Sequence, residues 1–420
     1  MINRTGGLPC GSATARREEF EERAVDQSGI PDGVLVDALV RARRRARPPT
    51  DRAQARAPDT EMTVRRPVAP HSERCHDLQR AGTDRAGTDG RIIGARMTTD
   101  RTGGDRSEQA TGIEVKAAAG HIGAEITGVD LAGDLDDVVV AAIRAAVLRW
   151  KVVFFRGQRL DHAGHVAFAR RFGEPVVLRR RGSASPRDFP EIETTADRLE
   201  LGGRFGMEHE EWLRRRRHTL LRGWHCDHGA RIDPPAATIL RAETVPPYGG
   251  DTTWSNLAAA YAGLSGPVRE FVDVLRAEHR LGVGYQPRPG DDAYVRHLLD
   301  HQVASLHPLV RVHPETGERI LYVNGYYVEQ IADLSRPESR AILDMLLEQA
   351  TRPEYTVRFR WEPGSVAFWD NRATIHLAPS DNVHLDFPRI MHRVMLAGDV
   401  PVGVDGKPSE PLVGTEPGRW

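Results

Sequence analysis

The sequence is poor in cysteine and carries no excess of charge of either sign. Only Cys10, Cys75 and Cys226 occur in 420 residues, too few for a disulfide framework, and this scarcity favours a reducing compartment. The formal net charge is −1 and the sequence pI is near 7.0. A balance of this kind excludes a global electrostatic attraction to nucleic acid or to an anionic membrane.

Long hydrophobic runs are also missing. The first ten residues lack the continuous apolar segment of a signal peptide, and no later segment approaches the ~20 apolar residues that a membrane span requires. We therefore expect a cytoplasmic protein without a membrane or nucleic-acid partner. The oligomeric state, including a homo-oligomer, is left open by the sequence.

The chain divides into an N-terminal extension and one folded domain. Residues 1–110 are dense in Arg, Asp, Thr, Pro and Gly and contain few large apolar residues, so we expect this stretch to be disordered. An alternative is that translation begins at Met97. The domain is expected at 111–405, with an insertion at about 198–222 and a C-terminal tail at 406–420.

Within the domain, short strands predominate and a few helices flank them. Alternating residues predict strands at 113–116 and 124–129, and continuous apolar residues predict one at 152–155. Helical periodicity predicts helices at 136–150, 163–172 and 267–280. The last third is rich in predicted strands, at 355–361, 365–369 and 390–396. This pattern favours a mainly β fold with flanking helices (α+β), built as a double-sheet jelly roll.

A metal-binding pattern lies in the middle of this domain. His225 and Asp227 stand in Trp-His-Cys-Asp-His, and His376 follows about 150 residues later in Trp-Asp-Asn-Arg-Ala-Thr-Ile-His. Two imidazoles and one carboxylate can hold one face of an Fe(II) ion and leave other positions open. Residues two apart on a strand point to the same face, so Cys226 is expected to point away.

Most of the 17 histidines are expected to be ordinary core or surface residues. His162, His165 and His301 have no neighbouring motif. His384 and His392 compete with His376 for the role of distal ligand, but His392 should face the opposite side of its strand from Arg393.

Two further segments accompany the ligands. Thr252 stands in Gly-Gly-Asp-Thr-Thr-Trp, and Arg389 stands in Pro-Arg-Ile-Met-His-Arg. With the metal motifs, these segments resemble the taurine dioxygenase (TauD/TfdA) family of Fe(II)- and 2-oxoglutarate-dependent enzymes, from about Ile113 to about Val402. The resemblance implies a distorted double-stranded β-helix, which is a cupin-like jelly roll.

The resemblance also implies roles for these residues. His225, Asp227 and His376 would be the catalytic metal ligands, and Thr252 and Arg389 would hold 2-oxoglutarate. An arginine can bind a carboxylate through two charge-assisted hydrogen bonds, to which a threonine hydroxyl adds another. Trp369 would form a neighbouring wall.

The expected reaction is a hydroxylation that consumes O2 and 2-oxoglutarate and releases succinate and CO2. The substrate would be a small anionic organic molecule such as a sulfonate or a sulfate ester. In the family a second arginine contacts the anionic head of the substrate, which points to Arg393, whose alternative role is that of a structural ion-pair partner. Tyr327 falls where a pocket aromatic residue is expected, or it belongs to the core.

The chain departs from the taurine enzymes at several positions. Arg179-Arg-Arg-Gly-Ser stands where a histidine and a tyrosine that help to hold taurine are expected, and Leu221 replaces an asparagine. The insertion carries Arg214-Arg-Arg-Arg-His, which is either a lid over the site or a solvated helix face. A larger biosynthetic metabolite is therefore an alternative substrate.

Functions of other classes are alternatives too. A zinc hydrolase could use two histidines and an aspartate, but Thr252 and Arg389 speak against it. A hydrolase would turn over without 2-oxoglutarate or oxygen, and a jelly-roll binding protein would turn nothing over. Nucleic-acid binding through 214–217 would weaken strongly with salt, and Glu210 and Glu211 dilute that charge.

Overall fold

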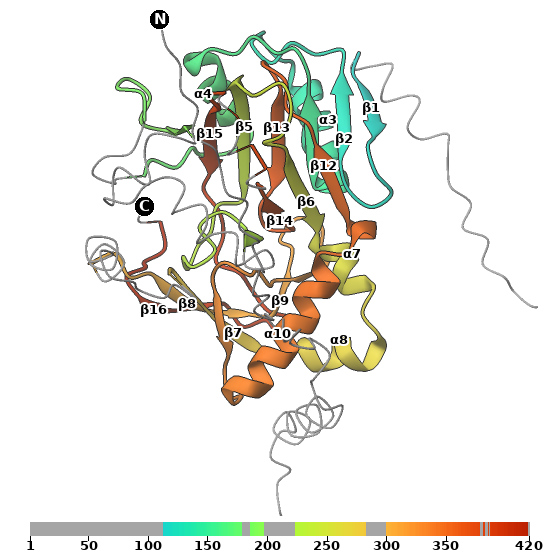
Figure 1. Ribbon diagram of the computed structural model, residues 1–420, viewed down its shortest axis with the longest axis vertical. Coiled ribbons are helices and arrows are strands. Elements are labelled where there is room, and N and C mark those ends of the chain that lie inside the picture. Colours follow the sequence, from blue (N-terminus) through green and yellow to red (C-terminus); the bar gives the residue numbers. More distant parts are fainter. Residues whose placement is uncertain are drawn as a thin grey trace, which may run out of the picture.

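The computed structural model describes residues 112–178, 185–196, 223–282, 300–378, 381–382, 385 and 387–418 (Figure 1). The predicted extension at 1–110, the insertion at 198–222 and His384 lie outside these residues.

The largest sheet has seven strands in the order β1-β2-β3-β13-β5-β15-β4 (Figure 1). Neighbouring strands are antiparallel except β2 and β3, which are parallel. In sheet order the strands are β1 (Glu114–Ala117), β2 (Ala124–Thr127), β3 (Val152–Phe155), β13 (Val366–Asp370), β5 (Ala237–Thr244), β15 (Ile390–Leu396) and β4 (Ile192–Ala196).

Helices cover one face of this sheet. Helix α3 (Asp137–Trp150) and helix α4 (His162–Arg170) pack with Val153 and Phe155 of β3 in one hydrophobic cluster. All four residues of β3 are buried, because the strand is covered on both faces, which explains its unbroken apolar sequence.

A three-stranded sheet covers the other face. It consists of β12 (Thr356–Phe359), β6 (Thr252–Asn256) and β14 (Thr374–Leu377). Trp254 and Phe359 from this sheet share a cluster with Phe154 and Trp369 from the large sheet. The Phe154 and Phe359 rings stack at 4.1 Å. Two packed antiparallel layers with this core are the predicted jelly roll, and the fold prediction is confirmed.

The rest of the described chain forms a second cluster of elements below the sandwich in Figure 1. A four-stranded sheet in the order β11-β7-β8-β16 and a pair β10-β9 lie with the helices here. The strands are β7 (Arg276–Arg280), β8 (Ala304–Pro308), β9 (Val310–Val312), β10 (Arg319–Leu321), β11 (Val328–Ile331) and β16 (Glu410–Val413). The helices are α7 (Leu257–Ala262), α8 (Gly266–Val272), α10 (Arg336–Ala350) and the 3-10 helix η2 (Pro353–Tyr355).

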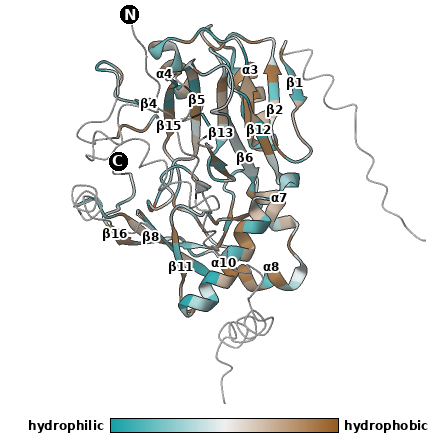
Figure 2. Ribbon diagram, in the orientation of Figure 1, coloured by the Kyte–Doolittle hydropathy of each residue, from teal (hydrophilic) through white to brown (hydrophobic). Residues whose placement is uncertain are grey.

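Hydrophobic and hydrophilic residues alternate along α10 (Figure 2). Ile342, Leu346 and Ala350 are buried in a cluster with Leu257 and Val272 from the shorter helices. One face of α10 therefore closes the core of this part of the molecule.

Most elements lie where the sequence predicts them, and one predicted helix is wrong over part of its length. The helix expected at 267–280 ends at Val272, and 276–280 is strand β7, whose side chains alternate between partly exposed and buried. The 15-residue helix α10 was not predicted. The segment expected as a tail at 406–420 contributes β16, which pairs with β8.

None of the helices in the described part of the chain is both long and apolar enough to cross a bilayer.

Candidate active site

The three predicted ligands come together. His225, Asp227 and His376 each offer one ligand atom, and these atoms lie within 4.8 Å of one another. Asp227 and His376 are buried, whereas His225 is partly exposed. His376 Nε2 lies 3.9 Å from Asp227 Oδ1. No other group of at least three His, Cys, Asp or Glu among the described residues is arranged in this way.

Backbone pairing holds the two histidines side by side. His225 and His376 form an isolated antiparallel bridge, with N–H···O bonds of 3.0 Å and 2.8 Å in the two directions. Their rings lie 4.3 Å apart. The strand expected around His225 is reduced to this bridge, because a turn begins at Asp227 and His228 takes a positive φ of 49°.

Cys226 points away from the ligands, as expected. Its Sγ lies 3.9 Å from the Tyr322 hydroxyl and 3.7 Å from Asn324 Nδ2. Burial raises the pKa of the Cys226 thiol to about 12. The residue is thus a packed, protonated thiol between two ligand positions.

The carboxylate of Asp227 is fixed from both sides. Thr238 Oγ1 donates to Asp227 Oδ2 at 2.7 Å, and Arg393 Nη1 donates to Oδ1 at 2.6 Å. Burial acts to raise the pKa of Asp227, but the Arg393 guanidinium and the imidazoles of His376 and His225 outweigh it and hold the pKa well below its usual range. Asp227 is therefore ionised, as a metal ligand must be.

Asn371 holds the backbone of the same residue. Its Oδ1 accepts from Asp227 N at 2.7 Å, and its Nδ2 donates to the carbonyl oxygens of Asp227 at 3.1 Å and Pro235 at 3.0 Å. Asn371 is only 1% exposed. This amide joins the loop of the first two ligands to the motif that ends on His376.

Both imidazoles are suited to bind a cation. His225 Nδ1 lies 2.9 Å from the Gly223 carbonyl oxygen, which requires a proton on Nδ1, so that in the neutral ring the lone pair is on Nε2. Burial, followed by the neighbouring His225, lowers the pKa of His376 to about 3. A neutral His376, a second imidazole with its proton on Nδ1 and an ionised carboxylate match the donor set of a divalent transition metal with open coordination positions.

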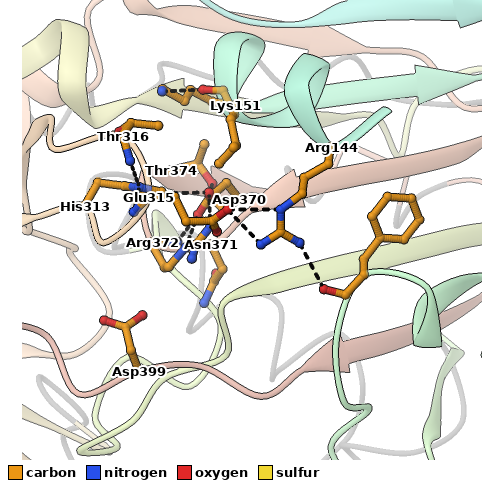
Figure 3. Close-up of polar contacts among 12 residues, drawn as sticks. Arg144, Lys151, His313, Glu315, Thr316, Asp370, Asn371, Arg372, Thr374 and Asp399 are labelled. Atoms are coloured by element: carbon orange, nitrogen blue, oxygen red, sulfur yellow. Dashed lines mark hydrogen bonds and ion pairs between the residues drawn. The ribbon is translucent and has the colours of Figure 1, made fainter. Parts of the chain in front are cut away.

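An ion network fixes the turn between Trp369 and His376 (Figure 3). The buried carboxylate of Asp370 accepts from Arg372 Nε at 2.9 Å and Nη2 at 2.7 Å, and it lies 2.9 Å from His313 Nε2. His313 Nδ1 accepts from the backbone N–H groups of Glu315 and Thr316. The His313 proton is therefore on Nε2, where it is donated to Asp370.

The network continues to the flanking helix. Arg372 pairs with Glu315 at 2.8 Å, and Glu315 pairs with Arg144 of α3 at 2.7 Å (Figure 3). Thr374 Oγ1 donates to the Asp370 carbonyl at 2.8 Å. Helix α3, the end of β13 and the start of β14 are thereby held in one arrangement.

One predicted 2-oxoglutarate residue, Trp369, lies beside His376, and another, Thr252, is on β6, which pairs with the strand of His376. The Trp369 ring is 5.0 Å from the His376 ring. Thr252 opens β6, is 3% exposed, and accepts from Trp361 Nε1 at 3.0 Å. A Cβ added at Gly250, whose φ is +68°, would lie 3.3 Å from Arg389 Cδ and Nε. The glycine thus lets the Arg389 side chain pass close to the backbone that leads into Thr252.

The two predicted substrate residues, Arg393 and Tyr327, both have defined surroundings in the structure. Arg393 is engaged by Asp227 and, through Nε and Nη2, by Glu193 Oε2 at 3.0 Å and 2.7 Å. Arg393 thus forms ion pairs with both carboxylates. Tyr327 is 8% exposed, and burial raises its pKa. Its neighbour Tyr326 has its ring 5.6 Å from the His225 ring.

The competing histidine of β15 lies elsewhere. His392 Nε2 is 2.8 Å from Glu243 Oε2, and its Nδ1 is 3.0 Å from Thr194 Oγ1. Its ring is 4.7 Å from that of His162 of α4. His392 therefore faces the helix side of the sheet and Arg393 the opposite side, as predicted.

Several site residues escaped the sequence analysis. Asn371 stood inside a recognised motif, so its position there was the available signal. Thr238, Glu193 and Tyr326 carried no comparable signal, because none of them stands in a recognised motif and their contacts at the site arise only in the folded chain.

Comparisons with known proteins agree with this geometry. Residues 114–395 match the family model described as "Taurine catabolism dioxygenase TauD, TfdA family". The chain is 41% identical over 302 residues to an alpha-ketoglutarate-dependent sulfate ester dioxygenase of Pseudomonas putida, covering 70% of this chain and 93% of that protein.

Solved structures give the same assignment. A taurine dioxygenase from Burkholderia xenovorans superposes with a TM-score of 0.60 at 48% identity, covering 72% of this chain and 97% of that one. AAD-2, solved in complex with Mn(II) and N-oxalylglycine, superposes with a TM-score of 0.54 at 25% identity, covering 69% and 98%. The chain belongs to the TauD/TfdA family and is an alpha-ketoglutarate-dependent dioxygenase.

Proposed function

We propose that this chain uses Fe(II) and O2 to hydroxylate a small anionic organic substrate, a sulfate ester or a sulfonate, with release of succinate and CO2. The observation that carries the proposal is the gathering of His225, Asp227 and His376 within 4.8 Å. The Pseudomonas putida relative, named for sulfate esters, supports the substrate class.

We assign the metal to His225 Nε2, one oxygen of Asp227, and His376. The metal, when bound, supplies oxygen activation coupled to the decarboxylation of 2-oxoglutarate. The protein residues fix the donor atoms in their charge states: Gly223 sets the tautomer of His225, and Thr238 and Arg393 orient Asp227. The Mn(II) complex of AAD-2 supports a divalent metal on this scaffold.

Thr252 and Arg389 would bind the distal carboxylate of 2-oxoglutarate, with Trp369 as a wall beside His376. Arg389 is 8% exposed and Thr252 is 3% exposed, so a charge-assisted bond between guanidinium and carboxylate would form away from bulk water. N-oxalylglycine in the AAD-2 structure has two carboxylates, like 2-oxoglutarate, and supports this role.

For a sulfate ester, one oxygen atom of O2 enters succinate and the other enters the C–H bond next to the ester oxygen. The hydroxylated carbon then collapses to an aldehyde and releases sulfate. A sulfonate would release sulfite by the same route.

The test is a comparison of medium-chain alkyl sulfates, alkanesulfonates and alcohols of equal chain length. We expect stoichiometric succinate, aldehyde and sulfate or sulfite from the anionic compounds, only when Fe(II), 2-oxoglutarate and O2 are all present. Sulfate release without 2-oxoglutarate or oxygen would identify a hydrolase instead. Turnover of the alcohols alone would reject the anionic substrate class.

We also propose that residues 111–405 are the catalytic domain and that the chain works in the cytoplasm. The first point is supported by the match of the family model to residues 114–395.

A further inference from the structure

Arg393 lies between two carboxylates of different exposure. Its Nη1 donates to Asp227 Oδ1 at 2.6 Å, while Nε and Nη2 donate to Glu193 Oε2 at 3.0 Å and 2.7 Å. The Asp227 side chain is 2% exposed, and those of Arg393 and Glu193 are 19% and 29% exposed. The guanidinium therefore bridges a metal-ligand carboxylate and a second carboxylate nearer to the surface.

Strand register makes this bridge a fixed feature. Arg393 of β15 stands directly opposite Glu193 of β4. Residues directly opposite on antiparallel strands project to the same face of the sheet, with Cβ atoms about 5 Å apart. Glu193 is thus delivered to the inner side of the sheet, where the ligands lie.

The charges explain why a second carboxylate is needed. A guanidinium that donates to a ligand oxygen competes with a metal cation for that oxygen. Its positive charge also repels the cation. Asp227 (−1) and Arg393 (+1) sum to zero, and Glu193 (−1) restores a net charge of −1 for the three side chains. Burial acts to raise the pKa of Glu193, but the Arg393 guanidinium outweighs it and lowers the pKa, so Glu193 supplies this charge at neutral pH.

Orientation adds to charge. An arginine side chain has many rotamers. Because Glu193 already holds the Arg393 side chain, less conformational entropy is lost when the guanidinium also donates to Asp227. With two bonds to Glu193, the third donor of Arg393 is directed at Asp227 Oδ1, while Thr238 holds Oδ2. The carboxylate plane of Asp227 is set by these two donors.

We propose that Glu193 is a positioning residue of the metal centre: acting through Arg393, it keeps the Asp227 carboxylate oriented and electrostatically available for a divalent cation. The proposal rests on the metal site of the proposed function. It assigns to β4 a role in metal affinity rather than only in sheet structure.

The test measures metal affinity without turnover. The full chain is titrated with Mn(II) in the absence of 2-oxoglutarate, and free Mn(II) is followed by electron paramagnetic resonance. Partners in the outer coordination environment typically contribute 10–100-fold to metal affinity, so we expect Glu193→Gln to raise the Mn(II) dissociation constant by about that factor. Glu193→Asp keeps the charge and should recover most of the affinity.

Glu191→Gln is the matched control. Glu191 is two residues away and pairs with Arg170 at 2.8 Å, so this substitution removes the same charge from the same segment without touching Arg393. Its Mn(II) dissociation constant should equal that of the wild type.

A double-mutant cycle tests the route through Arg393. In an Arg393→Met background, Glu193→Gln should change the dissociation constant several-fold less than it does in the wild type. Should Glu193→Gln not fold, Arg393→Lys tests the same bridge, because an ammonium group cannot reproduce the two-sided geometry of a guanidinium. We expect a similar loss of affinity.

The outcomes separate this proposal from the proposed function. Wild-type affinity in Glu193→Gln overturns the role of Glu193 and leaves the metal site intact. An equal loss in Glu191→Gln also overturns it, because the effect would then be long-range charge alone. If the wild-type chain does not bind Mn(II), the metal site fails and this inference fails with it.

Discussion

The immediate surroundings of each ligand residue set its protonation state. A carbonyl oxygen fixes the proton of His225, burial keeps His376 neutral, and Arg393 keeps Asp227 ionised. These assignments depend on contacts of one or two atoms, so single substitutions should have large effects on metal-dependent turnover.

The first prediction concerns the ligands themselves. His225→Ala or Asp227→Ala should lower succinate formation by more than about a hundredfold, because losing a direct ligand should exceed the 10–100-fold effect of an outer partner. Succinate is measured by chromatography under saturating 2-oxoglutarate. His121→Ala, at an exposed histidine, should retain full activity, and near-normal succinate in either ligand variant would contradict the site.

The second prediction concerns the co-substrate. Arg389→Ala should raise KM for 2-oxoglutarate by about thirtyfold or more, since truncating one partner of a buried charge pair costs upward of about 2 kcal/mol. Steady-state kinetics with varied 2-oxoglutarate measure the change. Arg340→Ala, which breaks an exposed pair with Asp344, is the control. An unchanged KM in Arg389→Ala would reject the clamp.

At the scale of elements, the segment from Trp369 to His376 connects the two sheets at the site. Asp370 ties it to Arg372 and His313, Asn371 ties it to Asp227, and His376 ends it as a ligand. Asp370, Asn371 and His376 thus make separate contacts, which together fix the position of the segment.

The third prediction follows from the charge of Asp370. Burial acts to raise the pKa of Asp370, but His313 and Arg372 outweigh it and hold the pKa well below the unfolded value of about 3.9. The ionised form therefore stabilises the fold above about pH 4, and this contribution is lost as the pH falls toward the folded pKa.

Asp370→Asn should lose on the order of 3 kcal/mol of unfolding free energy at pH 7 and show a flatter decline between pH 5 and 3. Urea unfolding at several pH values measures both effects. Asp344→Asn, at an exposed pair, should change little. A decline in Asp370→Asn as steep as in the wild type would show that another carboxylate governs acid sensitivity.

Elements also show where sequence reasoning succeeds and where it stops. The helices α3 and α4 were predictable because their buried residues recur at helical spacing, and strand β3 was predictable from its unbroken apolar run. Helix α10 was overlooked although Ser335 and Glu338 form a capping box at its start, a local signal that predicts a helix N-terminus. Residues 276–280 form strand β7 rather than the predicted helix because they pair with β8 and β11, whose residues are distant in the sequence.

The site follows the same rule. Ligands in short motifs could be identified from the sequence, since two of them are separated by a single residue and the third ends a recognisable pattern. The contact of Glu193 could not, because it arises from the register between β4 and β15, and that of Thr238 could not, because it joins a strand to the turn at Asp227. The arginine at position 393 indicated a partner with negative charge, but the sequence did not identify Asp227 and Glu193 as its partners.

At the scale of the whole molecule, metal binding should be coupled to global stability. The three ligands come from two segments about 150 residues apart in the sequence, and the unfolded chain cannot bring them together, so a cation binds only the folded state. The fourth prediction is that Mn(II) at 100 times its dissociation constant raises the unfolding free energy by about 2.7 kcal/mol. Urea unfolding with Mn(II) and with a chelator measures this difference, and His225→Ala should show none. Equal stabilisation of that variant would place the binding elsewhere.

The paired backbones of His225 and His376 have a consequence for how the enzyme matures. About 150 residues separate these two positions, yet each donates its amide hydrogen to the other's carbonyl oxygen. Closing so large a loop is slow compared with forming local helices. A newly made chain should therefore be unable to bind a metal ion at this site until the segments of His225 and His376 have paired.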